Sequence, residues 1–152
     1  MKTIEERLSY VEDRLALEDA VTRYCTGVDG LKDLDALLDC FAEDPVLDLT
    51  GIALPKFEGK DAVRGFFTQV FGDMTHHGHF TTNFVINKLE GDTANCNNYV
   101  MGMGRSRDGN EVLVYVKYDL DFVKENGVWK IKNFSEATIM PLPESVTAIH
   151  GR

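Results

Sequence analysis

Three of the four histidines in this chain lie in one stretch, THHGHFTTN, which covers residues 75–83. The imidazole ring changes charge near neutral pH and also binds transition metals, so a group of this kind suits two chemistries. One is coordination of a metal ion by neighbouring histidines. The other is transfer of a proton by one histidine that a carboxylate holds in place.

The metal interpretation rests on His77 and His79. They lie two positions apart on a segment that alternates like a strand, so their side chains would share one face. An H-x-H pair of this kind also opens the metal motif of the cupins. That motif continues with a glutamate, whereas Asn83 occupies the corresponding region here, and the next histidine is His150. We therefore expect no bound metal and no other cofactor.

The proton-transfer interpretation needs a carboxylate, and Asp29 stands apart from the other acids of the first third. It lies in YCTGVDG, between glycines, directly after an apolar helical stretch. An acid in a tight turn at that place can point back into the fold. Tyr24, five residues earlier, adds a phenol that can donate or accept a hydrogen bond. Tyr24, Asp29 and a histidine can thus meet in one pocket.

The elements that must position these residues begin with helices. Thr3 and Glu6 form a capping-box pattern, and apolar residues recur behind it at helical spacing until Gly27 and Gly30. A second short helix is expected over residues 34–41, stopped by Pro45. A short strand over 46–50, a loop over 51–59 and a third helix over 60–72 follow.

The second half of the chain has the alternation of long strands. Turn signals separate them, including Asn126-Gly127, which favours a tight hairpin. Gly102 and Gly104 are places where the sheet can bend or bulge. The four expected strands cover residues 77–89, 93–105, 111–125 and 128–140. Helices followed by a meandering sheet predict one α+β domain over residues 1–152, in which N-terminal helices pack in a strongly curved, mostly antiparallel sheet around a pocket.

The bulk composition narrows the class of partner. The formal net charge is -9, which disfavours nucleic acid. No apolar run is long enough for a membrane span, and acidic residues near the start argue against a signal peptide. The three cysteines are widely spaced, as expected for reduced thiols in a core. We expect a cytoplasmic protein that binds neither nucleic acid nor membrane.

The pattern as a whole resembles the SnoaL-like group of the nuclear-transport-factor-two-like superfamily, whose fold is a cystatin-like α+β cone. The stretches that carry the resemblance are ALEDAVTRYCTGVDGLKDLDALLDCFAEDPVLDL, FEGKDAVRGFF, HGHFTTNFVINKLEGDTA and NGVWKIKNF, which together span nearly the whole chain. Within the superfamily it is most similar to scytalone dehydratase, bile acid 7α-dehydratase and lindane dehydrochlorinase. Those enzymes use an Asp–His pair.

The resemblance implies roles for individual residues. Asp29 takes the position of the aspartate, and Tyr24 that of the tyrosine that precedes it in the bile acid enzyme. The H-x-x-x-N spacing to Asn83 places the catalytic histidine at His79, whereas the separation from the aspartate fits His77 slightly better. The stretch NCNNYVMG replaces charged residues or histidines of some relatives. The side chains expected to hold the substrate are those of His77, Asn97, Asn98 and Tyr99.

The sequence therefore predicts a cofactor-independent lyase of the dehydratase type, acting on a small hydrophobic cyclic or aromatic molecule. In this mechanism His79 removes a carbon-bound proton, Asp29 orients it and Tyr24 assists the departing or developing oxygen. An isomerase or cyclase using the same pocket, and a non-catalytic ligand-binding or oligomerising subunit, are the alternatives. We expect a homo-dimer or homo-trimer, and a C-terminal tail that covers the pocket mouth or a neighbouring subunit.

Overall fold

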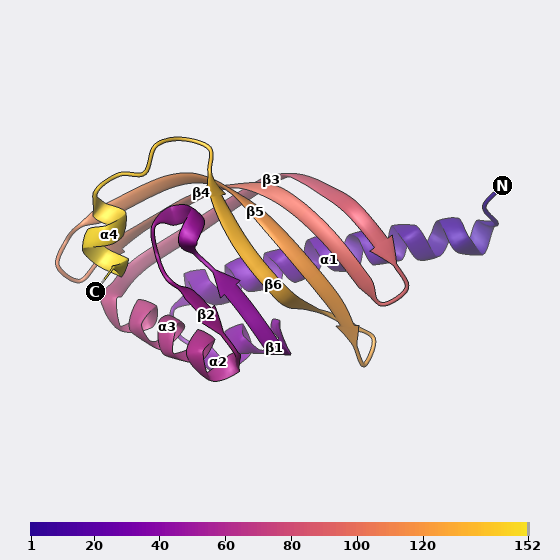
Figure 1. The fold of residues 1–152 in the computed structure, drawn as a ribbon, viewed down its shortest axis with the longest axis horizontal. Helices are drawn as coiled ribbons and strands as arrows, with labels where there is room; N and C mark the ends of the chain where they lie inside the picture. Colours follow the sequence, from indigo (N-terminus) through magenta and orange to yellow (C-terminus); the bar gives the residue numbers. More distant parts are fainter. Residues whose placement is uncertain (152) are drawn as a thin grey trace.

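The computed structural model describes residues 1–151, which form a layer of helices against one sheet (Figure 1). None of the helices in this range is long and apolar enough to cross a membrane. In chain order the elements are α1 (Ile4–Gly30), α2 (Leu34–Leu38), β1 (Phe41–Asp48), the 3-10 turn η1 (Thr50–Ile52), β2 (Lys56–Glu58), α3 (Lys60–Asp73), β3 (Met74–Glu90), β4 (Thr93–Ser106), β5 (Glu111–Glu125), β6 (Val128–Thr138) and α4 (Ser145–His150).

The sheet has six strands in the order β2-β1-β6-β5-β4-β3. Only β1 and β6 run parallel; all other neighbours are antiparallel. The predicted α+β class and the mostly antiparallel sheet are confirmed. The sheet is open, with β2 and β3 as its edges.

The three predicted hairpins are confirmed, and the reason is local. Gly91, Gly109 and Gly127 all have positive φ at the turns, which glycine adopts without strain. Asn126 also has a positive φ, and Glu125 pairs with Val128, so Asn126-Gly127 forms a two-residue hairpin loop.

Helix α1 is longer than its contact with the sheet. Thr3 and Glu6 form the predicted capping box. The apolar side chains of the first half are exposed, and this half projects past the sheet in Figure 1. The helix passes through Gly27 and ends at Gly30, with Leu31 as a left-handed cap. A Cβ at Gly27 would lie 3.3 Å from the Leu37 side chain, so this glycine permits close packing on α2 instead of ending α1.

The predicted second helix was too long. Helix α2 ends at Leu38, Phe41 already belongs to β1, and Pro45 lies inside that strand instead of stopping a helix. The strand tolerates proline because its pairing with β6 is irregular there: Phe41 pairs with Ile131 and Val46 with Asn133. The segment expected to be a loop contains η1 and β2.

The core lies between the helices and the concave face of the sheet. Its centre is aromatic: Tyr24 lies 5.1 Å from Phe134 and 5.9 Å from Phe41, measured between ring centroids. Phe67 of α3 and Tyr118 of β5 complete the group. Edge-to-face contacts of this kind add to the stabilisation that burial gives.

Gly51 of η1 packs directly on β6, and we predict that Gly51→Ala destabilises the fold. A Cβ at this position would lie 1.8 Å from the carbonyl oxygen of Glu136, so backbone must move. We expect the free energy of unfolding in urea to fall by about 1–3 kcal/mol, the usual effect of overpacking. Gly65→Ala in α3 is the control, since a Cβ there meets nothing within 4 Å. It should raise stability by about 0.5–1 kcal/mol through helix propensity; equal effects of the two changes would contradict this packing argument.

Candidate active site

Asp29 and His79 are joined by two hydrogen bonds. The ring Nδ1 of His79 lies 2.5 Å from Oδ1 of Asp29, and the backbone N–H of His79 donates to Oδ2 at 2.9 Å. Because an ionised carboxylate only accepts, Nδ1 carries a proton, and in the neutral form of the ring the lone pair is on Nε2. The side chains are 26% and 13% exposed for Asp29 and His79 respectively, so the pair is shielded but reachable.

Asp29 occupies an electrostatically unfavourable place. It lies in the last turn of α1, where the helix dipole disfavours a negative charge, and no basic residue is present in that turn. Burial by itself would raise its pKa, but the hydrogen bond, charge and backbone N–H of His79 lower the pKa below its usual value. Asp29 is therefore ionised at neutral pH, and the contact with His79 offsets the effect of burial.

His77 has a different environment from its neighbour. Its Nδ1 lies 3.3 Å from the carbonyl oxygen of Val28, one of the last carbonyls of α1, which lack partners within the helix. Burial, and then the charge of His79, lower the pKa of His77 to about 4. His77 is thus a neutral donor that caps the end of α1, and its ring lies 5.0 Å from that of His79 between centroids.

Two glycines make room for the two rings. Gly102 pairs with His79 and Gly104 with His77 across the β3–β4 ladder. A Cβ at Gly102 would lie 3.5 Å from Cδ2 of His79, and one at Gly104 only 2.9 Å from Cδ2 of His77. The pairing continues without a shift through both glycines, so they clear space for imidazoles and do not bulge the sheet.

One of the three register shifts between β3 and β4 lies instead at Asn83. Its φ is 57°, and the ladder shifts between Thr82 and Val85. Asparagine tolerates this left-handed conformation better than most residues. The asparagine of the H-x-x-x-N pattern therefore shapes the strand beyond His79 and, in this structure, does not contact the pair.

A cavity lies between the pair and the helices. Its wall is largely apolar and includes Val146 and His150 of α4, in agreement with the expectation that the tail covers the pocket. Its free volume is about 90 Å³. The titratable side chains that line it are those of Tyr24, His77, His79, Tyr118, Glu136 and His150.

Tyr24 lines this cavity, as predicted, but no hydrogen bond joins its hydroxyl to Asp29 or His79. Burial raises the pKa of Tyr24 well above its usual value, and the nearby Glu136 adds to this rise. Tyr24 is therefore a neutral phenol that can donate a hydrogen bond to a molecule in the cavity.

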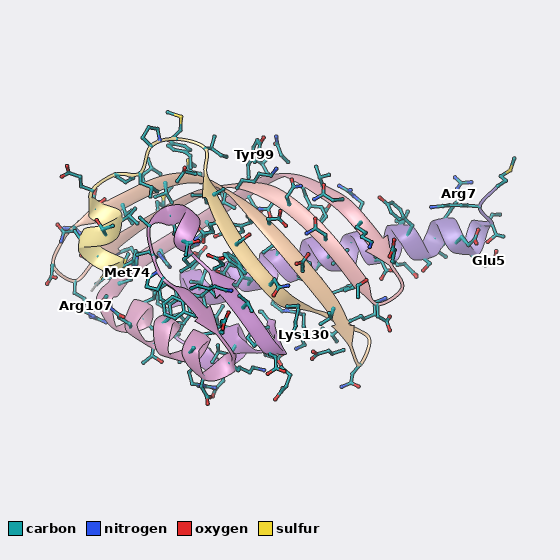
Figure 2. All side chains as sticks on the ribbon, in the orientation of Figure 1. Glu5, Arg7, Met74, Tyr99, Arg107 and Lys130 are labelled. Atoms are coloured by element: carbon teal, nitrogen blue, oxygen red, sulfur yellow. The ribbon has the colours of Figure 1, made fainter. Side chains whose placement is uncertain are left out.

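The remaining predicted substrate contacts are distributed over both faces of β4. Asn97 donates to Asn87 and Tyr99 is 42% exposed; both lie on the outer face, where Figure 2 shows Tyr99 pointing away from the helices. Asn98 faces inward and is buried, and its Oδ1 has no partner among the described residues, yet it does not line the cavity. The structure thus brings together Tyr24, Asp29, His77 and His79, and leaves Asn97, Asn98 and Tyr99 apart.

Sequence reasoning missed Glu136 as part of the cavity wall. It faces Tyr118 across β5 and β6. Glu136 follows Phe134 by two positions in NFSEAT, so strand alternation could have placed it on the inner face. The signal was weak because a glutamate in a strand is usually solvated.

Asp29, His77 and His79 are also the one group of side chains in residues 1–151 that could hold a metal ion. One ligand atom from each lies within 4.8 Å of the others. Both carboxylate oxygens of Asp29 already accept hydrogen bonds from His79. A metal would have to replace the ring hydrogen bond.

Comparison with known proteins gives a consistent family. The SnoaL-like domain matches residues 9–135. No curated protein matches the chain. A structure from Novosphingobium aromaticivorans, provisionally named as an aromatic ring hydroxylase, has 43% identity and a TM-score of 0.85; the match covers 88% of this chain and 93% of the other.

Two more distant structures share the fold. One, provisionally named as scytalone dehydratase of Novosphingobium aromaticivorans, has 24% identity and a TM-score of 0.77, with 87% of each chain covered. The other is hexachlorocyclohexane dehydrochlorinase of Novosphingobium barchaimii, with 19% identity and a TM-score of 0.75, covering 88% of this chain and 91% of that one.

We predict that His77 stays neutral far below the pH at which an ordinary histidine is protonated. Followed by ¹H–¹³C NMR, its ring should titrate near pH 4 instead of 6.5, with His77→Gln identifying the resonance. The unfolded chain binds this proton at higher pH than the folded one, so this group makes stability fall as pH drops from about 6.5 to 4. His77→Gln should remove that part of the pH dependence. A midpoint near 6.5 would show that the ring is hydrated.

Proposed function

The chain belongs to the SnoaL-like family, and from this membership together with the Asp29–His79 contact we propose that it is a cofactor-independent lyase of the dehydratase type. Its substrate is a small hydrophobic molecule with a cyclic or aromatic ring. The single observation that carries the proposal is the two-point hydrogen bonding of His79 by Asp29 beside an apolar cavity. A purely structural subunit has no need of an oriented, shielded imidazole.

In the proposed reaction Nε2 of His79 removes a proton from a carbon next to a carbonyl or another activating group. Asp29 holds the opposite nitrogen, fixes the tautomer and stabilises the imidazolium that forms. The electron pair of the C–H bond becomes part of a new double bond, and the leaving group departs from the neighbouring carbon. Tyr24 donates a hydrogen bond to the oxygen on which negative charge develops.

His79 is a better base than His77 on electrostatic grounds. The hydrogen-bond partner of the His77 ring is the carbonyl of Val28 and not a carboxylate of the described residues, and its pKa of about 4 makes it a weak proton acceptor at neutral pH. His79 has an ionised carboxylate at 2.5 Å. We propose that His77 contacts the substrate from the same face while His79 performs the transfer.

The apolar wall and the small volume support a single-ring substrate. A cavity of ~150 Å³ holds benzene, and the volume here is about 90 Å³. A ring can therefore enter only if part of the wall moves. Helix α4 contributes Val146 and His150 to the wall, is short and lies near a chain end, so we expect it to be the part that moves. The name of the 43% identical relative implies an aromatic compound, which agrees with this wall.

An isomerase or cyclase would use the same base and cavity as the proposed lyase. It would differ in the substrate group that lies beside the carbon from which the proton is removed. A non-catalytic ligand-binding role remains the alternative of a different class. Solvent exchange separates the classes, because only an enzyme accelerates exchange of a carbon-bound hydrogen above its rate in buffer alone.

We predict that the wild-type protein incorporates deuterium from D₂O into cyclic ketones, measured by mass spectrometry. His79→Gln should abolish exchange, and Asp29→Asn should reduce it by ~10²–10⁴-fold because the tautomer is lost. His76→Gln is the matched control, since this neighbouring ring is exposed. If exchange survives in His79→Gln but is lost in His77→Gln, His77 is the base. Loss on adding a chelator would favour the metal interpretation of the same three residues.

We further propose a homo-dimer or homo-trimer that buries the outer face of the sheet. Phe80, Met101 and Tyr115 form one cross-strand row on that face, and Met103 pairs with Leu113 beside them. Phe80 is 61% exposed, and the neighbouring side chains are also accessible. A continuous apolar patch of this kind is typical of an interface.

We predict that size-exclusion chromatography with light scattering gives a dimer or trimer for the wild type. The double change Phe80→Lys and Tyr115→Lys should give a monomer, because it places charge in the middle of the patch. Leu8→Lys, on the projecting half of α1, should leave the mass unchanged. A wild-type monomer, or dissociation by Leu8→Lys alone, would contradict the choice of this face.

A further inference from the structure

Glu136 is the one carboxyl side chain that lines the cavity within residues 1–151. It lies on the inner face of β6 together with Phe134, and faces Tyr118 on β5. The Asp29–His79 pair belongs to β3 and α1, so Glu136 comes from a different part of the wall. An acid and an oriented imidazole therefore border the same small space.

The backbone that carries Glu136 is held from three sides. Strand β6 lies between β1 and β5, with Ser135 paired to both Asp48 and Asp119. Gly51 of η1 approaches the Glu136 carbonyl so closely that no side chain fits between them. The backbone from which the Glu136 side chain extends to the cavity is therefore held in place by the fold.

Within residues 1–151, no lysine or arginine lines the cavity to hold Glu136 ionised. Leucine, isoleucine, valine and phenylalanine side chains form most of the wall, and they come from α1, α3, α4, β1, β4, β5 and the segment around η1. Burial raises the pKa of Glu136 to about 8, so it carries a proton at neutral pH. The titratable groups that face it from the packed elements are Tyr24 and Cys25 of α1, Tyr118 of β5, His77 and His79 of β3, and His150 of α4.

We propose that Glu136 is the proton donor of this site and that it acts on the substrate oxygen while His79 acts on the carbon. The inference rests on the proposed function and adds a second catalytic residue to it. The substrate is thereby specified further: its leaving group is an oxygen that must be protonated, such as a hydroxyl, in preference to a halide.

The proton balance of the step is complete without another reactant. His79 Nε2 takes the proton from carbon, and the C–H electron pair forms the double bond as the adjacent C–O bond breaks. The departing oxygen takes the proton of Glu136 and leaves as water. The site then holds an imidazolium and a carboxylate, and returns to its starting state when one proton moves from His79 to Glu136 through water.

Glu136 suits this role better than Tyr24. The Tyr24 phenol holds its proton more tightly than usual, because burial and the nearby Glu136 raise its pKa. Proton transfer is most efficient from a group whose pKa lies near the working pH. Tyr24 then remains a hydrogen-bond donor, and Glu136 is the group that gives up a proton.

The test compares wild type with Glu136→Gln on two substrates, 3-hydroxycyclohexanone and 3-chlorocyclohexanone. Glutamine keeps the size and a hydrogen-bond donor but has no proton to transfer. We expect loss of water from the hydroxy ketone to fall by ~10²-fold or more. Loss of chloride, which needs no acid, and deuterium exchange next to the carbonyl should change by less than ~5-fold, because they depend on Asp29, His79 and Tyr24 and not on Glu136.

The pH profile and stability give readouts that a structural role would not reproduce. In the wild type, water loss should decline above about pH 8, and Glu136→Gln should lack this decline.

The folded protein binds the Glu136 proton more tightly than the unfolded chain, so stability falls as pH rises from about 4.5 to 8. Glu136→Gln should therefore melt at a higher temperature than wild type at pH 7. Glu43→Gln, an exposed acid of β1, is the matched control. Equal losses on both substrates, or none on either, would overturn the proposal.

A binding measurement separates this inference from the proposed function. Binding of methoxycyclohexane, whose ether oxygen stands in for the leaving group and can only accept a hydrogen bond, should weaken ~10-fold or more between pH 6.5 and 9.5 in wild type and in His79→Gln, but not in Glu136→Gln, as followed by calorimetry. If this dependence is found without any elimination, Glu136 is a neutral donor and the lyase assignment fails. If wild-type binding does not depend on pH, Glu136 is not the donor, whatever reactions occur.

Discussion

The contact between Asp29 and His79 is the constraint on which the arrangement of this protein depends. It ties the end of α1 to the beginning of β3, 50 residues later in the chain. For the two to meet, α1 must run beneath the sheet and α3 must return the chain to the same end. The negative charge at a helix C-terminus is unfavourable without the histidine, and the ring needs the space that Gly102 leaves. Helix, strand and facing glycine are thus all adapted to one hydrogen-bonded pair.

Much of this could be read from the sequence, because the relevant signals are local. The capping box at Thr3 and the turn at Asn126-Gly127 involve neighbours in the chain, and both are confirmed. The wrong prediction of a helix up to Phe41, stopped by Pro45, arises from a contact between residues far apart in the chain. A helical stripe of leucines continues into a segment that pairs with β6, about 90 residues away, and this pairing overrides local propensity.

The predicted contacts on β4 show a different limit. Adjacent strand residues point to opposite faces, so a shift of one position exchanges the cavity for the outer surface. Asn97 and Tyr99 lie outside for this reason, while Asn98 between them lies inside. The composition of the sequence could identify this stretch of β4, but not which of its residues face the cavity. Glu136 was missed because its burial depends on three separate elements that no local pattern connects.

The two carboxyl groups near the cavity also show how one fold sets opposite states for similar side chains. Asp29 has an imidazole and a backbone N–H as donors, so it is ionised; Glu136 has an apolar wall, so it is protonated. An uncharged acid leaves the cavity suited to a hydrophobic ring, whereas an arginine at that position would hold water.

In the proposed reaction, negative charge appears on Glu136 only when the imidazolium appears on His79. The two opposite charges then attract each other across a space of low polarity, where that attraction is strong. In the proposed mechanism, the opposite protonation states of Asp29 and Glu136, each set by its environment, are what let one site perform both proton transfers at one pH.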